Sequence, residues 1–114
     1  MTDQVEIHIP RPRVQEGSAF TATAYFRDRA TSAASAPSTV KYRIDNLTTG
    51  DVEQDWTSVS AGASVSISVT ATHNAIRSPC NTVELKQLTV AANPDTETQV
   101  RQSIVYEVAN IRGF

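Results

Sequence analysis

The side chains best suited to nucleophilic or metal chemistry are few in this chain. His8 and His73 are its two histidines, and Cys80 is its one cysteine. His73 and Cys80 are the one conceivable base–nucleophile pair, but no second Cys/His pair completes a zinc pattern, and none of the serines sits in a G-x-S-x-G elbow. We therefore expect solvated histidines and an inert thiol, with no catalytic residue, no metal site and no cofactor.

A group of carboxylates surrounds a predicted hairpin turn at Thr49–Gly50. They are Asp45, Asp51, Glu53 and Asp55. These side chains could bind a cation weakly, but no D-x-D-x-D-G calcium loop accompanies them. We expect them to be solvated charges that keep a strand edge from pairing wrongly.

One aromatic pair has two readings. Trp56 and Tyr42 lie in neighbouring predicted strands and could mark a contact with a carbohydrate or a protein. A single tryptophan in a small sandwich is more often part of the core, and we expect that position for Trp56.

Length and charge exclude several classes of protein. The 114 residues suffice for one domain, predicted to span residues 1–114. A net charge of −2 weighs against a nucleic-acid partner. No run approaches the length of a membrane span, and the polar start does not resemble a signal peptide. These features predict a protein made in a reducing cytoplasm, where a single cysteine forms no internal disulfide.

The elements that position these residues are strands, because apolar and polar residues alternate in many short segments. In residues 83–90 the apolar positions change from odd to even, which predicts a bulge near Lys86–Gln87 or a strand that starts late. Pro10 and Pro12 end the first strand. The alternating segments are residues 5–9, 20–26, 40–45, 52–56, 65–71, 83–90 and 104–108.

About seven short strands separated by turns predict an all-β fold, an immunoglobulin-like two-sheet antiparallel β-sandwich. Two such sheets bury their apolar faces against each other. The expected core consists of Phe20, Phe26, Tyr42, Trp56, Ile67, Val69, Leu88, Ile104 and Tyr106.

Four segments carry a resemblance to small immunoglobulin-like virion proteins of tailed bacteriophages. They are residues 20–26 (FTATAYF), 40–50 (VKYRIDNLTTG), 55–57 (DWT) and 88–92 (LTVAA), and the likeness extends from Val5 to Asn110. The resemblance implies a non-enzymatic component of the phage particle. A capsid cement or decoration protein that binds the major capsid protein is the first expectation. A tail or head–tail component, including a host-surface adhesion module, is the alternative.

Position in the chain suggests which residues would touch the particle. The two terminal arms are the expected contacts with the capsid lattice, and copies of the chain are further possible partners. The arm residues are Ile7, Ile9, Arg11, Arg13, Ile111 and Phe114.

Overall fold

A computed structural model describes residues 3–28, 31, 33–78, 80–93 and 99–110. These residues form strands joined by turns and loops, as the alternation predicted. The strands are β1 (Asp3–His8), β2 (Arg13–Gln15), β3 (Phe20–Asp28), β4 (Val40–Asn46), β5 (Val52–Val59), β6 (Ser64–Val69), β7 (Val83–Ala92) and β8 (Val100–Ala109). Within the described ranges, no helix is long and apolar enough to cross a membrane.

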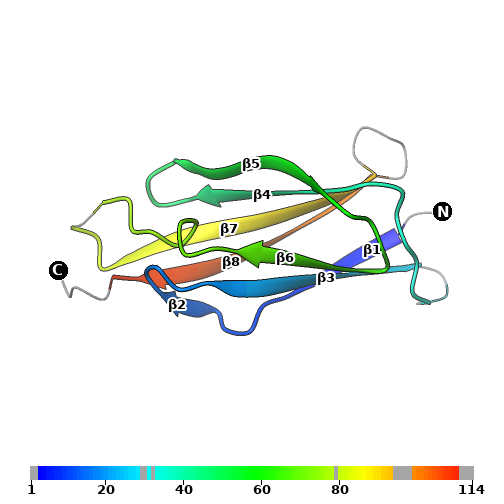
Figure 1. Ribbon diagram of the computed structural model, residues 1–114, viewed down its shortest axis with the longest axis horizontal. Coiled ribbons are helices and arrows are strands. Elements are labelled where there is room, and N and C mark those ends of the chain that lie inside the picture. Colours follow the sequence, from blue (N-terminus) through cyan, green and yellow to red (C-terminus); the bar gives the residue numbers. More distant parts are fainter. Residues whose placement is uncertain (1–2, 29–30, 32, 79, 94–98, 111–114) are drawn as a thin grey trace.

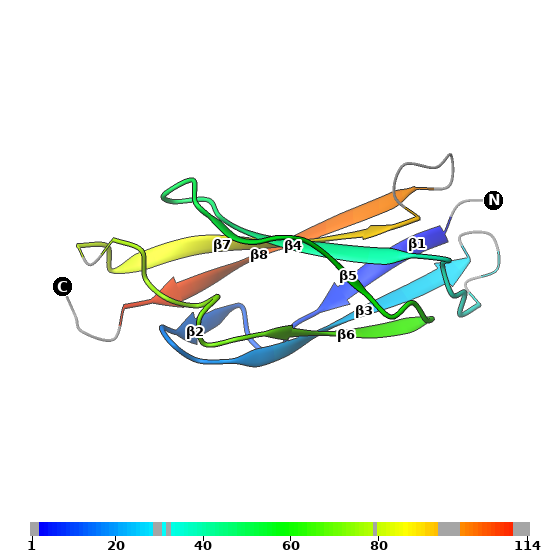
Figure 2. The same cartoon turned by 45° about the horizontal axis from the view of Figure 1, so that its top comes forward.

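The strands form two sheets that lie face to face (Figure 1). One sheet has the order β1-β3-β6, and the other has the order β2-β8-β7-β4-β5. Figure 2 shows β4 and β7 as one layer above β3 and β6. The prediction of an all-β fold with two stacked sheets is therefore confirmed.

The core lies between the inward faces of the two sheets. Phe20, Ala22 and Ala24 of β3 pair in register with Val69, Ile67 and Val65 of β6, so these side chains share one face. Among the expected core residues, Phe26, Ile67, Val69, Leu88 and Tyr106 are buried, while Phe20, Tyr42 and Ile104 are half-buried and pack against them. Trp56 is not in this core, and its position is described below.

Strand β7 corrects the predicted bulge. It pairs with β8 without interruption from Val83↔Ala109 to Ala92↔Val100. Its inward positions are the even ones throughout, and two of them carry the buried side chains of Glu84 and Lys86. The apolar pattern changed phase because these two inward residues are charged, while Leu85 faces outward and is exposed.

Strand β2 was not predicted, and it makes the larger sheet mixed instead of antiparallel. Pro10 and Pro12 end β1, and the chain then crosses to the other sheet, where Arg13–Gln15 pair with β8 in parallel. Three residues place a single side chain inward, Val14, which is too short a pattern for alternation to reveal.

Candidate functional site

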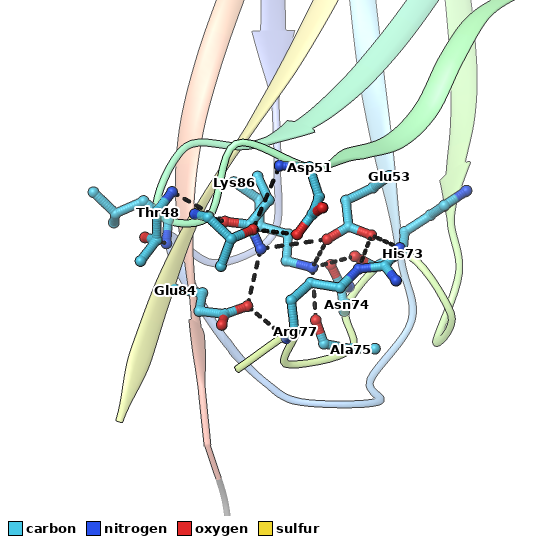
Figure 3. Close-up of polar contacts among 12 residues, drawn as sticks. Thr48, Asp51, Glu53, His73, Asn74, Ala75, Arg77, Glu84 and Lys86 are labelled. Carbon is cyan, nitrogen blue, oxygen red and sulfur yellow. Dashed lines mark hydrogen bonds and ion pairs between the residues drawn. The ribbon is translucent and has the colours of Figure 1, made fainter. Parts of the chain in front are cut away.

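A buried polar cluster occupies the end of the sandwich where the β4–β5 turn meets the β6–β7 connection (Figure 3). We use this name for eight residues from β4, β5, β7, β8 and the connection. They are Asn46, Glu53, His73, Asn74, Arg77, Glu84, Lys86 and Tyr106. The side chains of seven are buried, and that of Arg77, which is 44% exposed, closes the cluster towards solvent. The cluster fills the part of the interior where the apolar core ends.

Lys86 lies at the centre of the cluster, and its side chain is fully buried. Its ammonium donates to Glu53 Oε2 at 2.5 Å, to the His73 carbonyl at 2.8 Å and to the Ala75 carbonyl at 2.7 Å. An ammonium has three N–H donors, so each has a partner. Lys86 thereby joins β7 to β5 and to the β6–β7 connection.

Glu53 shares its carboxylate between two cations. Arg77 donates to Oε1 through Nε at 2.9 Å and Nη2 at 2.5 Å, while Lys86 holds the other oxygen. Burial acts to raise the pKa of Glu53, but the bonds and charges of Arg77 and Lys86 outweigh it and lower the pKa below 4.5. Glu53 is therefore a buried, doubly paired carboxylate, and its predicted role as a solvated charge is wrong.

Glu84 holds the β6–β7 connection against β7. Its carboxylate accepts from the backbone N–H groups of Arg77 and Ser78, both at 2.8 Å, and from the side-chain amides of Asn81 at 3.0 Å and Asn46 at 2.9 Å. Burial acts to raise the pKa of Glu84, but these four bonds lower it below 4.5. A carboxylate so saturated stays ionised inside the protein.

His73 is buried and bonded through both ring nitrogens, so its predicted solvation is wrong. The backbone N–H of Thr70 donates to Nδ1 at 3.0 Å, which requires this nitrogen to be unprotonated. Nε2 then carries the proton and donates to Gln54 Oε1 at 3.0 Å. Burial lowers the pKa of His73 below 6.5, Lys86 adds to this effect, and Glu53 opposes it.

Asn74 connects the cluster to the rest of the fold. Its amide donates to the Ser18 carbonyl at 2.7 Å, and its Oδ1 accepts from the Tyr106 hydroxyl at 2.8 Å. Burial, together with the charge of Glu53, raises the pKa of Tyr106, so this hydroxyl remains a donor. One amide therefore ties the β6–β7 connection to both β8 and the β2–β3 turn.

These contacts define what the cluster can do. Lys86, Glu84 and His73 each direct their polar atoms at protein partners, an arrangement that fixes the connection in place. Over the described residues, no group of three or more His, Cys, Asp or Glu side chains is placed to hold a metal ion. The geometry thus supports a structural role for these charges.

The other residues singled out from the sequence lie apart from the cluster or at its rim. Cys80 is exposed, and the His73 ring bonds to Thr70 and Gln54 instead. Arg43 bridges Asp45 at 2.9 Å and Asp55 at 3.6 Å on the outer face of the larger sheet. Asp51 accepts from the Thr49 hydroxyl at 2.6 Å in the β4–β5 turn. The four carboxylates therefore do not converge.

The predicted contact residues of the N-terminal arm differ in how far their side chains are buried. Ile7 and Ile9 are half-buried and pack against the core, whereas Arg11 and Arg13 are exposed. Arg13 Nε lies 3.2 Å from Glu107 Oε2. Ile111 and Phe114, the two C-terminal candidates, lie outside the described residues.

Trp56 lies on the outer face of the larger sheet, and its predicted place in the core is wrong. The guanidinium carbon of Arg101 is 5.4 Å from the centre of its ring, a cation–π distance. Arg101 pairs with Ala91, which is buried but lies outside the core cluster. The Trp56–Arg101 contact therefore lies on the surface. It joins β5 to β8 over the outer face of β4 and β7, the two strands between them.

Sequence reasoning missed Lys86, Glu84 and Arg77. The signal that could have found the first two was the change of phase in residues 83–90. An unbroken strand with two inward charges explains this change as well as a bulge does, and it requires nearby partners for those charges.

Comparison of the chain with models of known protein families and with curated protein sequences finds no match.

Proposed function

We propose that the fold is immunoglobulin-like and that the protein is a non-enzymatic structural component of a tailed-phage virion. The strand order supports the first part. In immunoglobulin domains, strands A, B and E share one sheet, while C, F and G share the other, extended in some members by C′. Here β1, β3 and β6 match the first set, and β4, β5, β7 and β8 match the second.

Within the virion, we place the protein on the head, as a cement or decoration protein bound to the major capsid protein lattice. Neighbouring copies of the chain are a further partner. Many copies on a lattice bind with avidity, so each contact can be weak and needs a rigid scaffold more than a deep cleft.

One observation carries this proposal: the charged side chains most capable of chemistry stabilise the scaffold from within. Lys86 and Glu53 are fully buried against each other, and Glu84 is saturated by four donors. The surface presents small polar side chains, such as Ser64, Ser66 and Ser68 of β6. A rigid sandwich with such a surface is suited to binding through defined patches.

The experiment is cosedimentation of the purified protein with heads of the phage that encodes it, prepared without the protein. We expect saturable binding to heads and none to isolated tails. Binding to tails alone would replace the head assignment with the tail or head–tail assignment. Binding to neither would contradict a virion role.

The tail alternative, a host-surface adhesion module, is favoured by one feature, the half-exposed ring of Trp56 on the outer face. If this ring stacks on a host sugar, Trp56→Ala abolishes binding to host cells. Tyr25→Ala, which removes an exposed aromatic ring from the other sheet, is the matched control. Host-cell binding by the Trp56→Ala protein at wild-type strength would exclude adhesion through this ring.

A further inference from the structure

A pocket of about 270 Å³ lies beside the N-terminal crossover, at the corner between the two sheets. Its walls come from the segment that leaves β1, from β2 and from the start of β3. The lining residues are Pro10, Arg11, Arg13, Val14, Gln15, Ser18, Ala19 and Phe20. None of these residues belongs to the buried polar cluster.

The path of the chain explains why space remains here. The last pair between β1 and β3 is His8↔Thr23, so residues 20–22 of β3 extend past the end of β1. Beyond His8 the chain crosses to the other sheet, where Arg13 begins the pairing with β8. Along this stretch of β3, no described strand takes the place that β1 leaves.

Two guanidinium groups give the pocket its charge. Among the described residues, none forms a hydrogen bond or ion pair with the side chain of Arg11. Arg13 contacts Glu107 through Nε, and a guanidinium has five N–H donors, so further donors remain for a ligand. Adjacent arginine side chains with open donors are suited to a carboxylate or phosphate.

The remaining walls combine apolar side chains with the polar residues Gln15 and Ser18, and several of them are held in place. The ring of Phe20 packs edge-on against Tyr106, with ring centres 5.2 Å apart. Val14 packs against the core. The Ser18 carbonyl accepts from Asn74, and the Ser18 N–H donates to the Gln15 carbonyl at 3.1 Å. A pocket whose walls are already ordered avoids part of the entropic cost of binding.

The volume and the positive charge of the pocket limit the kinds of ligand that it can hold. Pockets for small-molecule ligands commonly measure about 300–1,000 Å³, so 270 Å³ suits one or two side chains better than a cofactor. A nucleic-acid backbone requires a more extended basic surface than two arginines on a chain with net charge −2. A protein segment fits both the small volume and the small basic surface of the pocket.

We propose that this pocket receives an acidic segment of the partner protein. A Glu or Asp carboxylate of the partner pairs with Arg11 and Arg13, and an adjacent apolar side chain packs beside Phe20. This inference rests on the proposed function, because it names the surface through which the protein would hold its virion partner.

The first test uses capped peptides and does not depend on the virion. One peptide contains Glu followed by Leu, and the second has Gln in place of Glu. We expect the acidic peptide to shift the backbone amide NMR signals of Val14, Gln15 and Ser18 and to bind at least tenfold more tightly than its Gln counterpart. Equal binding of both peptides, or shifts equally large with acetate alone, would overturn the proposal.

Variants of the chain supply the matched controls. Arg11→Gln/Arg13→Gln removes two exposed charges at the pocket, and Lys41→Gln/Arg43→Gln removes two charges from the outer face of β4. The first double variant should lose at least tenfold in affinity for the acidic peptide, and the second should keep wild-type affinity. Equal losses in both variants would show a general effect of net charge and refute a pocket-specific contact.

The same variants separate this inference from the proposed function in the cosedimentation assay. Loss of head binding with Arg11→Gln/Arg13→Gln alone supports both. Undiminished head binding by that variant would refute the pocket as the contact while leaving the virion role intact. If the wild-type protein fails to bind heads or tails, the virion role fails, and the peptide titration still decides whether the pocket binds acidic segments.

Discussion

At the scale of single residues, the most consequential contact is the ion pair between Lys86 and Glu53. Both side chains have an exposed fraction of 0%. Removing a charge from water is costly, and a buried pair recovers that cost only when further hydrogen bonds complete it. Here two backbone carbonyls and Arg77 supply those bonds.

Breaking this pair from one side should therefore be severe. We expect Lys86→Met to lower the free energy of unfolding by about 3–5 kcal/mol, because Glu53 would stay buried with one cation fewer. Adding Glu53→Gln should cost less than the sum of the single effects, with a coupling of at least about 1 kcal/mol. Urea unfolding of the two single variants and the double variant measures these values.

The exposed ion pair between Arg13 and Glu107 is the control for this comparison of single and double variants. Glu107→Gln should cost under about 1 kcal/mol, since a surface ion pair contributes little. If the effects of Lys86→Met and Glu53→Gln were additive, the two charges would act independently, contrary to the contact.

His73 should make stability depend on pH. Its folded-state pKa is lowered below 6.5, so as the pH falls below 6.5 the unfolded chain takes up a proton that the folded protein resists. The free energy of unfolding should decrease over this range by up to about 1.4 kcal/mol per pH unit until the folded pKa is reached. Above pH 6.5 His73 is neutral in both states and contributes no slope.

Substitution identifies the group responsible. His73→Gln should remove the slope just below pH 6.5, while His8→Gln, which changes an exposed histidine, should keep it. Below pH 4.5 a second loss should persist in both variants, because the lowered pKa values of Glu53 and Glu84 favour their ionised folded forms. An unchanged slope in His73→Gln would assign the effect to another group.

At the scale of elements, the sequence predicted strands well wherever inward residues are apolar. Residues 20–26 and 65–69 alternate cleanly, and they form β3 and β6 in the expected phase. Strand β7 departs from its prediction, because a hydrophobic pattern assigns every charged residue to the outside. Glu84 and Lys86 face inward because groups of β4, β5 and the β6–β7 connection saturate them, which is information that the alternation within one strand does not contain.

The same limit applies to Trp56 and the β6–β7 connection. Residue type alone favours a core position for Trp56, but Arg101, far along the chain, provides a cation–π partner on the outer face. Residues 73–78 lack periodicity, so their order could not be predicted. Their order follows from two side chains of β7: the Glu84 carboxylate accepts from the backbone of this segment, and the Lys86 ammonium donates to it.

The role of Glu84 in ordering this connection can be measured directly. Glu84→Gln keeps the shape of the side chain but weakens its bonds to the backbone N–H groups of Arg77 and Ser78. We expect these two amides to exchange with solvent at least tenfold faster in the variant. Glu6→Gln on β1 is the control, because this glutamate is exposed. Unchanged protection at Arg77 and Ser78 would mean that other contacts order the segment.

At the scale of the whole molecule, the two sheets depend on one shared core. Residues of β3 and β6 from the smaller sheet pack in the same cluster as residues of β4, β7 and β8 from the larger one. Among the described strands, each sheet has only the other to cover its inward face. The sheets should therefore unfold together, in a single cooperative transition.

A core substitution in one sheet should therefore shift the unfolding midpoint measured by a fluorescent residue on the other sheet. Ile67 of β6 is buried in the smaller sheet, whereas Trp56 lies on the outer face of the larger sheet. We expect Ile67→Ala to destabilise the protein by about 2–5 kcal/mol. Trp56 fluorescence and far-ultraviolet circular dichroism should report the same shifted midpoint in urea.

The control for this prediction is Ser66→Ala, which changes an exposed neighbour in the same strand and should leave both midpoints near the wild-type value. If the fluorescence midpoint stayed fixed while the dichroism signal split into two steps, each sheet would be stable by itself. That result would contradict the shared core. In the role proposed above, a load taken up at the corner pocket would have to cross both sheets, so coupling between the sheets is the property that this proposal requires.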